Sequence, residues 1–256
     1  MLSASDFDLG DRFALVTGAS RGIGEAIARR FARHGAQVIV SSRNVEACEA
    51  VAASIRDSGG RAWAHSCHMG DVAQIEAMMK WIDEKFGRLD VLVNNAAANP
   101  YFGHVTGTSP EAFQRTVDVN IRGYFFSMVH AVKMMQRAGS GSIINVASVS
   151  GVVPGPQQGI YSITKAAVIS MTKVFAAECG AMGVRVNALL PGITDTRFSA
   201  ALVSDDAMLA QYLPRVPLGR VAEPEEITGA ALYLASAAAS YTTGACLPVD
   251  GGYLVK

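Results

Sequence analysis

Three residues in the middle of the chain have the types and spacing that proton transfer requires. Tyr161 and Lys165 lie four residues apart, and Ser148 lies thirteen residues before the tyrosine. Side chains four apart on a helix share one face, so an ammonium group below the phenol favours the ionised phenol. A tyrosine that releases a proton near neutral pH can act as a general acid or base. The same spacing also occurs on ordinary solvated helix faces, so the rest of the chain must decide between the two interpretations.

Short apolar runs and segments of helical period alternate along the chain and predict the scaffold around these residues. Strands are expected at 12–17, 37–42, 61–66, 90–93, 142–147, 184–189 and 245–249. Helices are expected at 22–34, 45–57, 71–86, 110–137, 159–181 and 224–235. This alternation is typical of βαβ units around a parallel sheet. We expect one doubly wound α/β (Rossmann) domain over 1–256, with a seven-stranded parallel sheet flanked by helices.

Composition excludes several classes of partner. Lysine plus arginine equals aspartate plus glutamate, 22 against 22, so no basic surplus favours nucleic acid. The four cysteines are scattered without a CxxC pair, and we therefore expect reduced thiols and no metal site. The first residues lack the pattern of a signal peptide, and no uninterrupted apolar run approaches the roughly 18 residues of a membrane span. We expect a cytoplasmic protein that binds a small molecule, and no membrane.

A glycine-rich turn between the first strand and the first helix has the features of a phosphate-binding loop. Gly18, Gly22 and Gly24 give a GxxxGxG spacing. Glycine lets the backbone approach a pyrophosphate closely, and the helix start beyond Gly22 offers free N–H groups and the positive end of its dipole. An ordinary tight turn is the alternative. Because a strand precedes the turn and a helix follows it, we favour dinucleotide binding.

The end of the second strand indicates which dinucleotide is bound. In dinucleotide-binding folds an acidic residue there usually takes the ribose hydroxyls and repels a 2′-phosphate. This chain has Ser42, Arg43 and Asn44 at that point and no carboxylate. Arg43 can pair with a phosphate, and Arg21 in the glycine turn can reach the same group. We therefore expect NADP(H) to be preferred over NAD(H), unless both arginines are merely solvated.

Six motifs in this order and spacing resemble the single-domain short-chain dehydrogenase/reductases. They are TGASRGIG at 17–24, NNAA at 94–97, Asn120, Ser148, YSITK at 161–165 and PG at 191–192. The resemblance extends from about Gly10 to Gly252. It favours a proton-transfer site at Tyr161 and Lys165 over an ordinary solvated helix face. Within the family, SSRN at 41–44 and NAAANPYFG at 95–103 are most similar to NADPH-dependent carbonyl reductases of the DHRS4-like and tropinone-reductase-like groups.

The resemblance implies a role for each catalytic candidate. Tyr161 would donate a proton to a carbonyl oxygen, and Lys165 would lower the pKa of the phenol and hold the nicotinamide ribose. Ser148 would hydrogen-bond the substrate oxygen, and Asn120 would order a water beside the lysine. The predicted cofactor contacts are Gly18, Ser20, Arg21, Gly22, Ile23, Gly24, Ser42, Arg43, Asn44, His68, Met69, Asn95, Ala96, Tyr161, Lys165, Pro191, Gly192, Ile193, Thr194 and Thr196.

Two positions depart from the family pattern. His68 and Met69 replace an Asp-Val pair near the adenine, so the side-chain contact to the adenine amino group is in doubt while a backbone contact can survive. Ala97 replaces the glycine of NNAG, which affects only the shape of the pocket. Trp63 and Trp81 are interpreted as packing residues.

The predicted activity is NADPH-dependent reduction of a ketone or aldehyde to an alcohol, which is reversible. Segments 99–102, 149–159 and 198–216 should form the substrate pocket, and their side chains favour an apolar or aromatic ketone. The pocket residues expected are Tyr101, Phe102, Val152, Val153, Phe198, Met208, Tyr212 and Leu213. Two alternatives remain: a 3-oxoacyl-thioester reductase and a non-catalytic dinucleotide sensor. The long helices suit an interface, and the resemblance implies a homotetramer.

Overall fold

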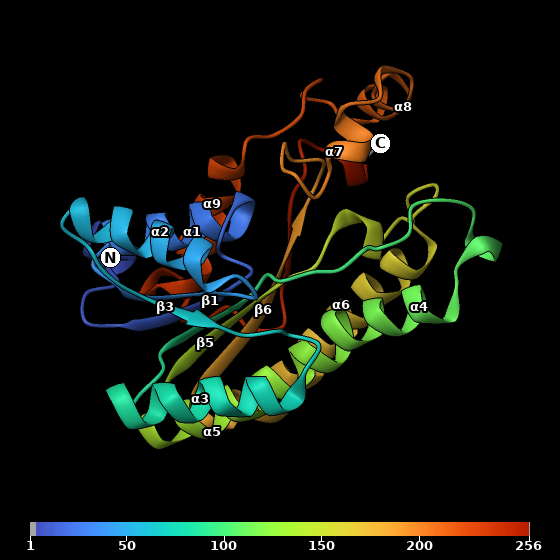
Figure 1. Cartoon of the computed structure of the whole chain (residues 1–256). Coiled ribbons are helices and arrows are strands. Elements are labelled where there is room, and N and C mark those ends of the chain that lie inside the picture. The colour runs from blue at the N-terminus through green and yellow to red at the C-terminus, as the bar shows by residue number, and fades with distance from the viewer. Residues whose placement is uncertain (1–3, 256) are drawn as a thin grey trace.

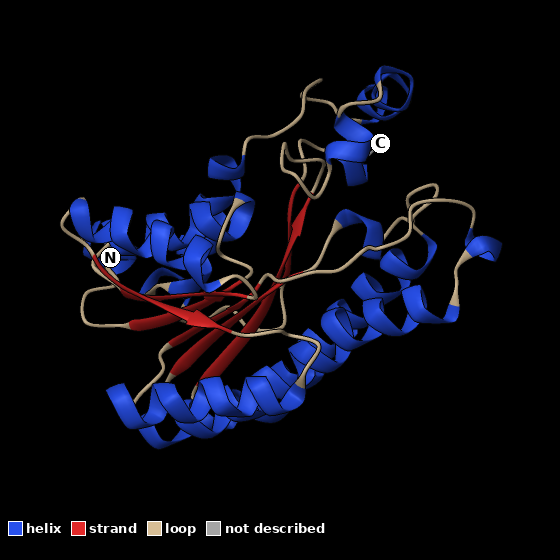
Figure 2. Ribbon diagram, viewed as in Figure 1, coloured by secondary structure: helices blue, strands red, loops and turns tan. Residues whose placement is uncertain are grey.

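Seven parallel strands form one sheet in the computed structural model, which describes residues 4–255. Their spatial order is β3-β2-β1-β4-β5-β6-β7. The strands are β1 (Phe13–Thr17), β2 (Gln37–Ser42), β3 (Arg61–Ser66), β4 (Val91–Asn94), β5 (Gly141–Val146), β6 (Val184–Pro191) and β7 (Cys246–Val249). The predicted seven-stranded parallel sheet is confirmed, and Figure 2 shows it between two layers of helices.

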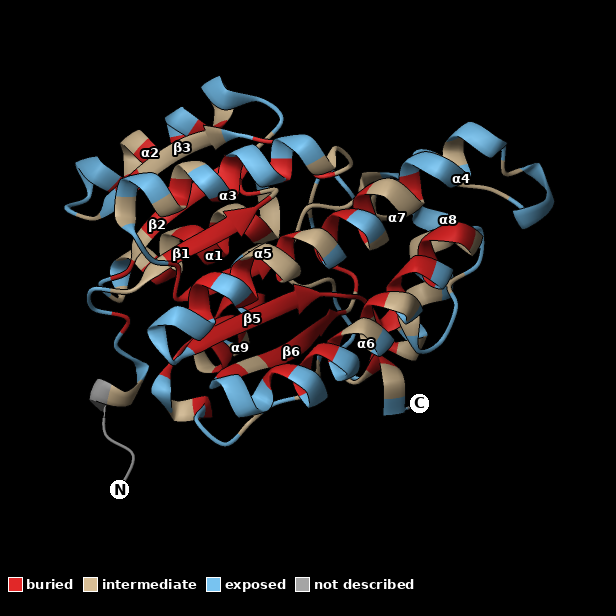
Figure 3. Ribbon diagram, turned by 90° about the horizontal axis from the view of Figure 1, so that it is seen from below, coloured by how far each residue is buried: buried red, intermediate tan, exposed pale blue. Residues whose placement is uncertain are grey.

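Helices cover both faces of the sheet (Figure 1). One layer contains α1 (Gly22–Arg33), α2 (Val45–Asp57) and α9 (Pro224–Ala235). The other contains α3 (Val72–Phe86), α5 (Gly123–Ala138) and α6 (Gly159–Cys179). Successive residues of β1 point to opposite faces: Val16 packs in the core beneath the first layer and Leu15 in the core beneath the second. Strands β1, β5 and β6 are therefore buried on both faces (Figure 3).

The strand order opens a crevice at the carboxyl ends of the central strands. The chain runs outward from β1 through β2 to β3, and then returns to β4 on the other side of β1. The connections after β1 and β4 therefore leave the sheet toward opposite faces, and a crevice opens between them at the carboxyl ends of the strands.

One helix differs from its prediction. The expected helix at 110–137 is divided into α4 (Pro110–Val117), a π-helical segment (Asp118–Arg122) and α5. In this segment the N–H of Gly123 donates to the carbonyl of Asp118, one residue further back than in an α-helix. Asn120 lies in the segment and is fully buried. The wide turn inserts a residue without breaking the apolar pattern, so hydrophobic spacing cannot predict it.

The helix that carries Tyr161 and Lys165 is long and apolar. By length and composition alone, Gly159–Met182 could cross a membrane, with a mean hydropathy of 1.2, but 56% of this window is buried inside the fold. Core helices of water-soluble proteins have the same properties. The segment 191–221 contains α7 (Ala200–Val203) and α8 (Asp206–Tyr212), as expected for a loop with short helices.

Candidate active site

A cleft of about 1030 Å³ lies at the carboxyl ends of the strands and is lined by the segments that follow β1 to β6. It brings together Ser148, Tyr161, Lys165 and every predicted cofactor contact except Gly24. Asn120 does not line it either. The lining residues that were predicted as cofactor contacts are Gly18, Ser20, Arg21, Gly22, Ile23, Ser42, Arg43, Asn44, His68, Met69, Asn95, Ala96, Tyr161, Lys165, Pro191, Gly192, Ile193, Thr194 and Thr196.

The buried side of this cleft contains the three candidates for proton transfer. Helix α6 places Tyr161 and Lys165 on one face, and the lysine Nζ lies 5.5 Å from the centre of the tyrosine ring. Lys165 is 1% exposed, and its Nζ donates to the carbonyl of Val146 at 2.6 Å. Ser148 follows β5, and its side chain hydrogen-bonds the phenol of Tyr161. The three groups therefore meet at the end of β5.

Burial controls the protonation of these groups. It lowers the pKa of Lys165 from 10.5 to about 7, because an ammonium group is poorly solvated there. It raises the pKa of Tyr161 from 10.0 to about 12, against the lowering effect of the hydrogen bond from Ser148. In the protein alone, burial of the phenol therefore outweighs this hydrogen bond, and the role of Lys165 in lowering the tyrosine pKa stays a prediction. Tyr161 keeps its proton at neutral pH and can act as an acid.

The glycine turn has the close approaches that a dinucleotide loop requires. Gly18 has a φ of +64°, and a Cβ there would lie 2.7 Å from the Cα of Ala96. Arg21 precedes α1 without a side-chain cap, so N–H groups of the first turn are free for a ligand. Gly24 has a different role from the one predicted. A Cβ there would meet the Asn95 Nδ2 at 2.4 Å, so Gly24 allows packing inside the protein and does not line the cleft.

Thr17 and Asn95 hold this turn against β4. The Thr17 hydroxyl donates to the carbonyl of Val93 at 3.2 Å and accepts from the N–H groups of Asn95 and Ala96 at 3.0 and 3.2 Å. The Asn95 Nδ2 donates to the carbonyls of Thr17 and Gly18 at 2.9 and 3.1 Å. Sequence reasoning gave Thr17 no role. The signal was available, since this polar residue ends an apolar strand.

Asn120 lies behind the cleft wall. Its Oδ1 accepts from the N–H of Ala98 at 2.8 Å, and its Nδ2 donates to the Ala98 carbonyl and to the Thr164 hydroxyl, both at 3.0 Å. The side chain thus ties the loop after β4 to α6, next to Lys165. Its predicted role in ordering a water stays a prediction.

The turn after β2 bounds the end of the cleft that is predicted to hold the adenosine. Arg43 is exposed and lines the cleft. The Asn44 side chain is already used, because its Oδ1 caps α2 by accepting from the N–H of Ala47 at 2.6 Å. Glu46 also lines the cleft, and it is the only carboxylate among the described lining residues. Sequence reasoning missed it, although it follows Arg43 by only three residues. His68 lines this end as well, and its Nδ1 accepts from the Gly70 N–H at 3.0 Å.

The end of the cleft that is predicted to hold the substrate contains only part of the expected set of residues. Phe102, Phe198 and Tyr212 line the cleft, and the Phe198 ring lies 5.6 Å from that of Tyr161. The other expected residues, Tyr101, Val152, Val153, Met208 and Leu213, do not line it.

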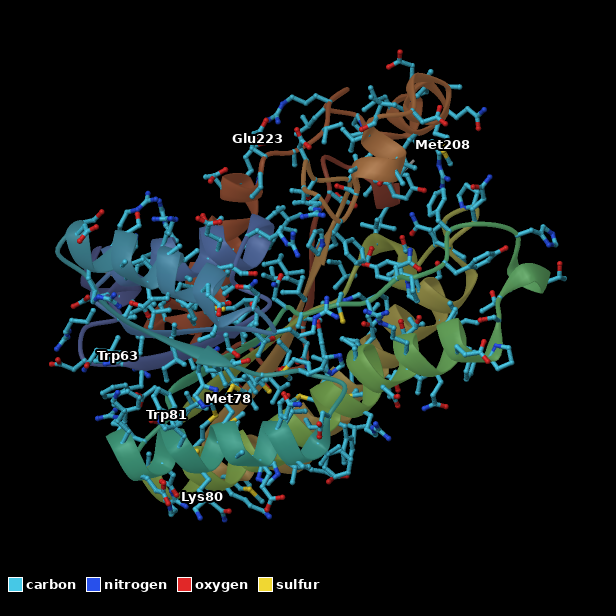
Figure 4. All side chains as sticks on the ribbon, viewed as in Figure 1. Trp63, Met78, Lys80, Trp81, Met208 and Glu223 are labelled. Atoms are coloured by element: carbon cyan, nitrogen blue, oxygen red, sulfur yellow. The ribbon has the colours of Figure 1, made fainter. Side chains whose placement is uncertain are left out.

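Two of these five residues are placed by their own contacts or position, and two polar residues line the cleft. The Tyr101 hydroxyl donates to the His104 carbonyl at 2.9 Å, and Met208 lies out on α8 (Figure 4). Ser150 and Gln158 belong to the predicted segment 149–159, although they were not among the side chains named for it; they line the cleft and hydrogen-bond to each other at 3.1 Å.

The two tryptophans outside the cleft are packing residues, as predicted. Trp63 and Trp81 pack against Phe86, with ring centres 4.9 and 5.6 Å away, near β3 and α3 (Figure 4). Among residues 4–255 there is no cluster of three or more His, Cys, Asp or Glu side chains that could hold a metal ion.

Comparison with known proteins gives consistent matches over the whole chain. The family described as Enoyl-(Acyl carrier protein) reductase matches residues 18–254. The chain is 40% identical to a 2,5-dichloro-2,5-cyclohexadiene-1,4-diol dehydrogenase of Sphingobium indicum over 248 residues, which cover 96% of this chain and 98% of that one. It is 35% identical to Dehydrogenase/reductase SDR family member 4 of Oryctolagus cuniculus, over 95% of this chain and 94% of the relative.

A solved structure shares the fold closely. The crystal structure of a gluconate 5-dehydrogenase from Burkholderia cenocepacia, in complex with NADP and tartrate, matches with a TM-score of 0.95 and 34% identity, covering 98% of each chain. The relatives are oxidoreductases that act on CH–OH groups. The motifs, the parallel sheet, the clustered Ser148, Tyr161 and Lys165, and these matches together show that the chain belongs to the short-chain dehydrogenase/reductase family.

Proposed function

We propose that this oxidoreductase is NADPH-dependent and reduces a ketone or aldehyde to an alcohol, reversibly. The proposal rests on one observation: Ser148, Tyr161 and Lys165 line the same cleft as the glycine turn. When bound, the nicotinamide cofactor supplies the hydride for reduction or accepts it in oxidation.

The protein's own residues manage the proton and the developing charge. Tyr161 holds a proton at its phenol oxygen at neutral pH and donates it to the substrate oxygen as that oxygen becomes an alkoxide. Ser148 hydrogen-bonds the same oxygen and stabilises its charge. Lys165 has a pKa of about 7, so it gains and loses a proton easily near neutral pH. It can therefore return a proton to the Tyr161 phenol oxygen.

The cleft fits a dinucleotide that carries a 2′-phosphate. Free N–H groups at the start of α1 would hold the diphosphate, and a Cβ added to Gly22 would enter that space 3.3 Å from the Thr196 side chain. Arg43 and Arg21 line the cleft and would pair with the 2′-phosphate. The solved gluconate 5-dehydrogenase holds NADP, which supports the same preference here. Glu46 would weaken that preference by repelling the phosphate.

The catalytic assignment is tested by Tyr161→Phe. Losing the proton donor should lower kcat by about 10²–10⁴-fold while the NADPH dissociation constant, measured by fluorescence, stays nearly the same. Tyr241→Phe is the matched control, because Tyr241 is fully exposed. Full turnover by Tyr161→Phe would show that another group donates the proton. A carrier-linked 3-oxoacyl thioester in the same assay tests the rival substrate class.

The cofactor preference is tested by kcat/KM for NADPH and NADH. Arg43→Ala should lower the value for NADPH by about tenfold or more and hardly change the value for NADH, since a charge-assisted contact to the phosphate is lost. Arg33→Ala, at the far end of α1, should change neither value. Glu46→Gln should raise the value for NADPH. A wild-type preference for NADH would contradict the proposal.

We further propose a soluble, cytoplasmic homotetramer. Several large apolar side chains on α4, α5 and α6 are exposed in the single chain, which supports an interface between copies. They are Phe113, Phe125, Ile163 and Val174. Light scattering tests this proposal, and a monomer would contradict it.

A further inference from the structure

Two carboxamide side chains line the cleft with hydrogen-bonding groups that no described residue uses. Asn99 lies in the loop after β4, and Gln158 precedes α6 by one residue and Tyr161 by three. Both line the cleft that contains the catalytic residues. The N–H of Gly103 donates to the Gln157 carbonyl at 3.0 Å, so the loop that carries Asn99 runs beside the start of α6.

Asn99 is the less satisfied of the two. Its Oδ1 is buried and has no hydrogen-bond partner among residues 4–255, and no hydrogen bond from its Nδ2 is found there either. Turning the amide over would only exchange which polar atom is left without a partner. Buried polar atoms in native proteins are nearly always paired, and one without a partner costs stability. The other amide atom is not sealed in this way, and because Asn99 lines the cleft, that atom is the one that a ligand can reach.

Gln158 is held in place and yet keeps its donor free. Its Oε1 accepts from the Ser150 hydroxyl at 3.1 Å, which fixes the amide and leaves its Nε2 hydrogens available. The N–H of Ser150 donates in turn to the Ser148 Oγ at 3.1 Å. A chain of hydrogen bonds therefore connects Gln158 to the serine that contacts the reacting oxygen.

The Asn99 amide can turn either its oxygen or its nitrogen toward the cleft, so with the donor on Gln158 it matches a hydroxyl group, which both donates and accepts. We propose that the substrate carries a second hydroxyl group near its reacting carbon, which Asn99 and Gln158 recognise, so that the enzyme acts on hydroxyketones and the corresponding diols. Phe102, Val149 and Phe198 cover the carbon skeleton. A plain ketone leaves both amides without partners, and sites of this kind discriminate strongly against analogues that lack the hydroxyl. The inference rests on the proposed function and narrows its substrate.

Matched pairs of alcohols test the inference with the wild-type enzyme and NADP⁺. We would compare kcat/KM for cyclohexanol with that for each positional isomer of cyclohexanediol, and for phenylethanol with that for phenylethanediol. At least one diol should exceed its partner by about tenfold or more, the effect of satisfying one or two hydrogen bonds. Turnover without preference for any diol overturns the hydroxyl inference but leaves the proposed function standing. Turnover of no alcohol in the panel, by protein that binds NADPH, overturns both.

Variants connect the preference to the two amides. Asn99→Leu and Gln158→Met keep similar size but remove the polar atoms, and each should lower the ratio of diol to mono-alcohol by about tenfold. Asn99→Asp keeps an acceptor and should retain much of the ratio. Gln136→Leu, on the exposed end of α5, is the matched control and should leave the ratio unchanged.

Folding of each variant is checked by its thermal unfolding temperature and by NADPH fluorescence. An Asn99→Leu protein that folds, binds NADPH and keeps the full diol preference overturns the inference. If Asn99→Leu does not fold, Gln158→Met is used instead. A Gln158→Met protein that folds, binds NADPH and keeps the full diol preference then overturns the inference.

Discussion

Replacing Lys165 with methionine should stabilise the fold while removing its activity. Burial lowers the pKa of this lysine from 10.5 to about 7, at about 1.4 kcal/mol per pKa unit, so keeping it charged costs the folded state about 5 kcal/mol. Methionine has a similar length and carries no charge. The variant loses one hydrogen bond to Val146, worth about 1–2 kcal/mol, but that carbonyl still accepts from the Tyr124 hydroxyl. The net gain should be about 3 kcal/mol below pH 7.

The gain in the free energy of unfolding from Lys165→Met should decrease as the pH rises. Below about pH 7 the lysine is protonated in both the folded and the unfolded chain, and the full cost of burial is present. Between about pH 7 and 10.5 the unfolded chain keeps a proton that the folded chain has released, so wild-type stability rises with pH. The methionine variant has no such rise, and its advantage shrinks across this window. Tyr161, with its pKa raised from 10.0 to about 12, makes stability fall with pH from about pH 10 upward, which overlaps only the top of this window.

Urea unfolding followed by circular dichroism at about pH 6, 8 and 10 measures the difference between the two proteins. Near pH 6 the variant should also melt about 6–12 °C higher, at about 2–4 °C per kcal/mol for a chain of this size. Lys133→Met, at an exposed position of α5, is the control and should show no comparable gain. An advantage that is absent near pH 6, or equal near pH 6 and pH 10, would refute the reasoning.

Two further predictions concern the glycine turn. Thr17→Val should lower the free energy of unfolding by about 3 kcal/mol, because two partly buried N–H groups lose their acceptor and one carbonyl loses a donor. Thr108→Val, whose hydroxyl has no described partner, should change that free energy by less than about 0.5 kcal/mol in the same urea titration. Gly24→Ala places a Cβ 2.4 Å from the Asn95 Nδ2 and should weaken NADPH binding at least about tenfold by fluorescence. Gly229→Ala, in a helix with nothing within 4 Å of its Cβ, should instead stabilise by up to about 1 kcal/mol. Normal NADPH binding by Gly24→Ala, or unchanged stability in Thr17→Val, would contradict these assignments.

The sequence predicted the sheet and the first half of the chain closely, because local signals mark the element ends. The strands at 37–42 and 61–66 and the helix between them have the predicted bounds. Asn44 caps that helix, and Gly59, with a φ of +84°, ends it. Where capping and turn residues flank an apolar pattern, neighbouring residues alone determine the boundary.

Features that depend on distant contacts were not predictable. The π-helical turn around Asn120 leaves the apolar pattern unchanged, so only the folded chain reveals it. The pocket residues were misplaced because loop conformation decides which side chains face the cleft. Gln157, for example, has a φ of +60°, which turns the loop before α6, and Val152 and Val153 are left exposed. Motif resemblance could predict that Ser148, Tyr161 and Lys165 lie together in one cleft, because there the residue types themselves carry the proposed chemistry.

The hydrogen bond from Asn95 to the carbonyl of Thr17 joins residues 78 apart in the sequence. A chain still on the ribosome that ends before β4 therefore contains the whole glycine turn and the start of α1, but lacks the residue that fixes their geometry. Contacts between distant residues form late, because a long loop must first close. We expect cofactor binding to begin only when β4 has docked beside β1. NADPH would then stabilise finished molecules over unfinished ones, so the abundance of this enzyme in a cell should follow the supply of its cofactor.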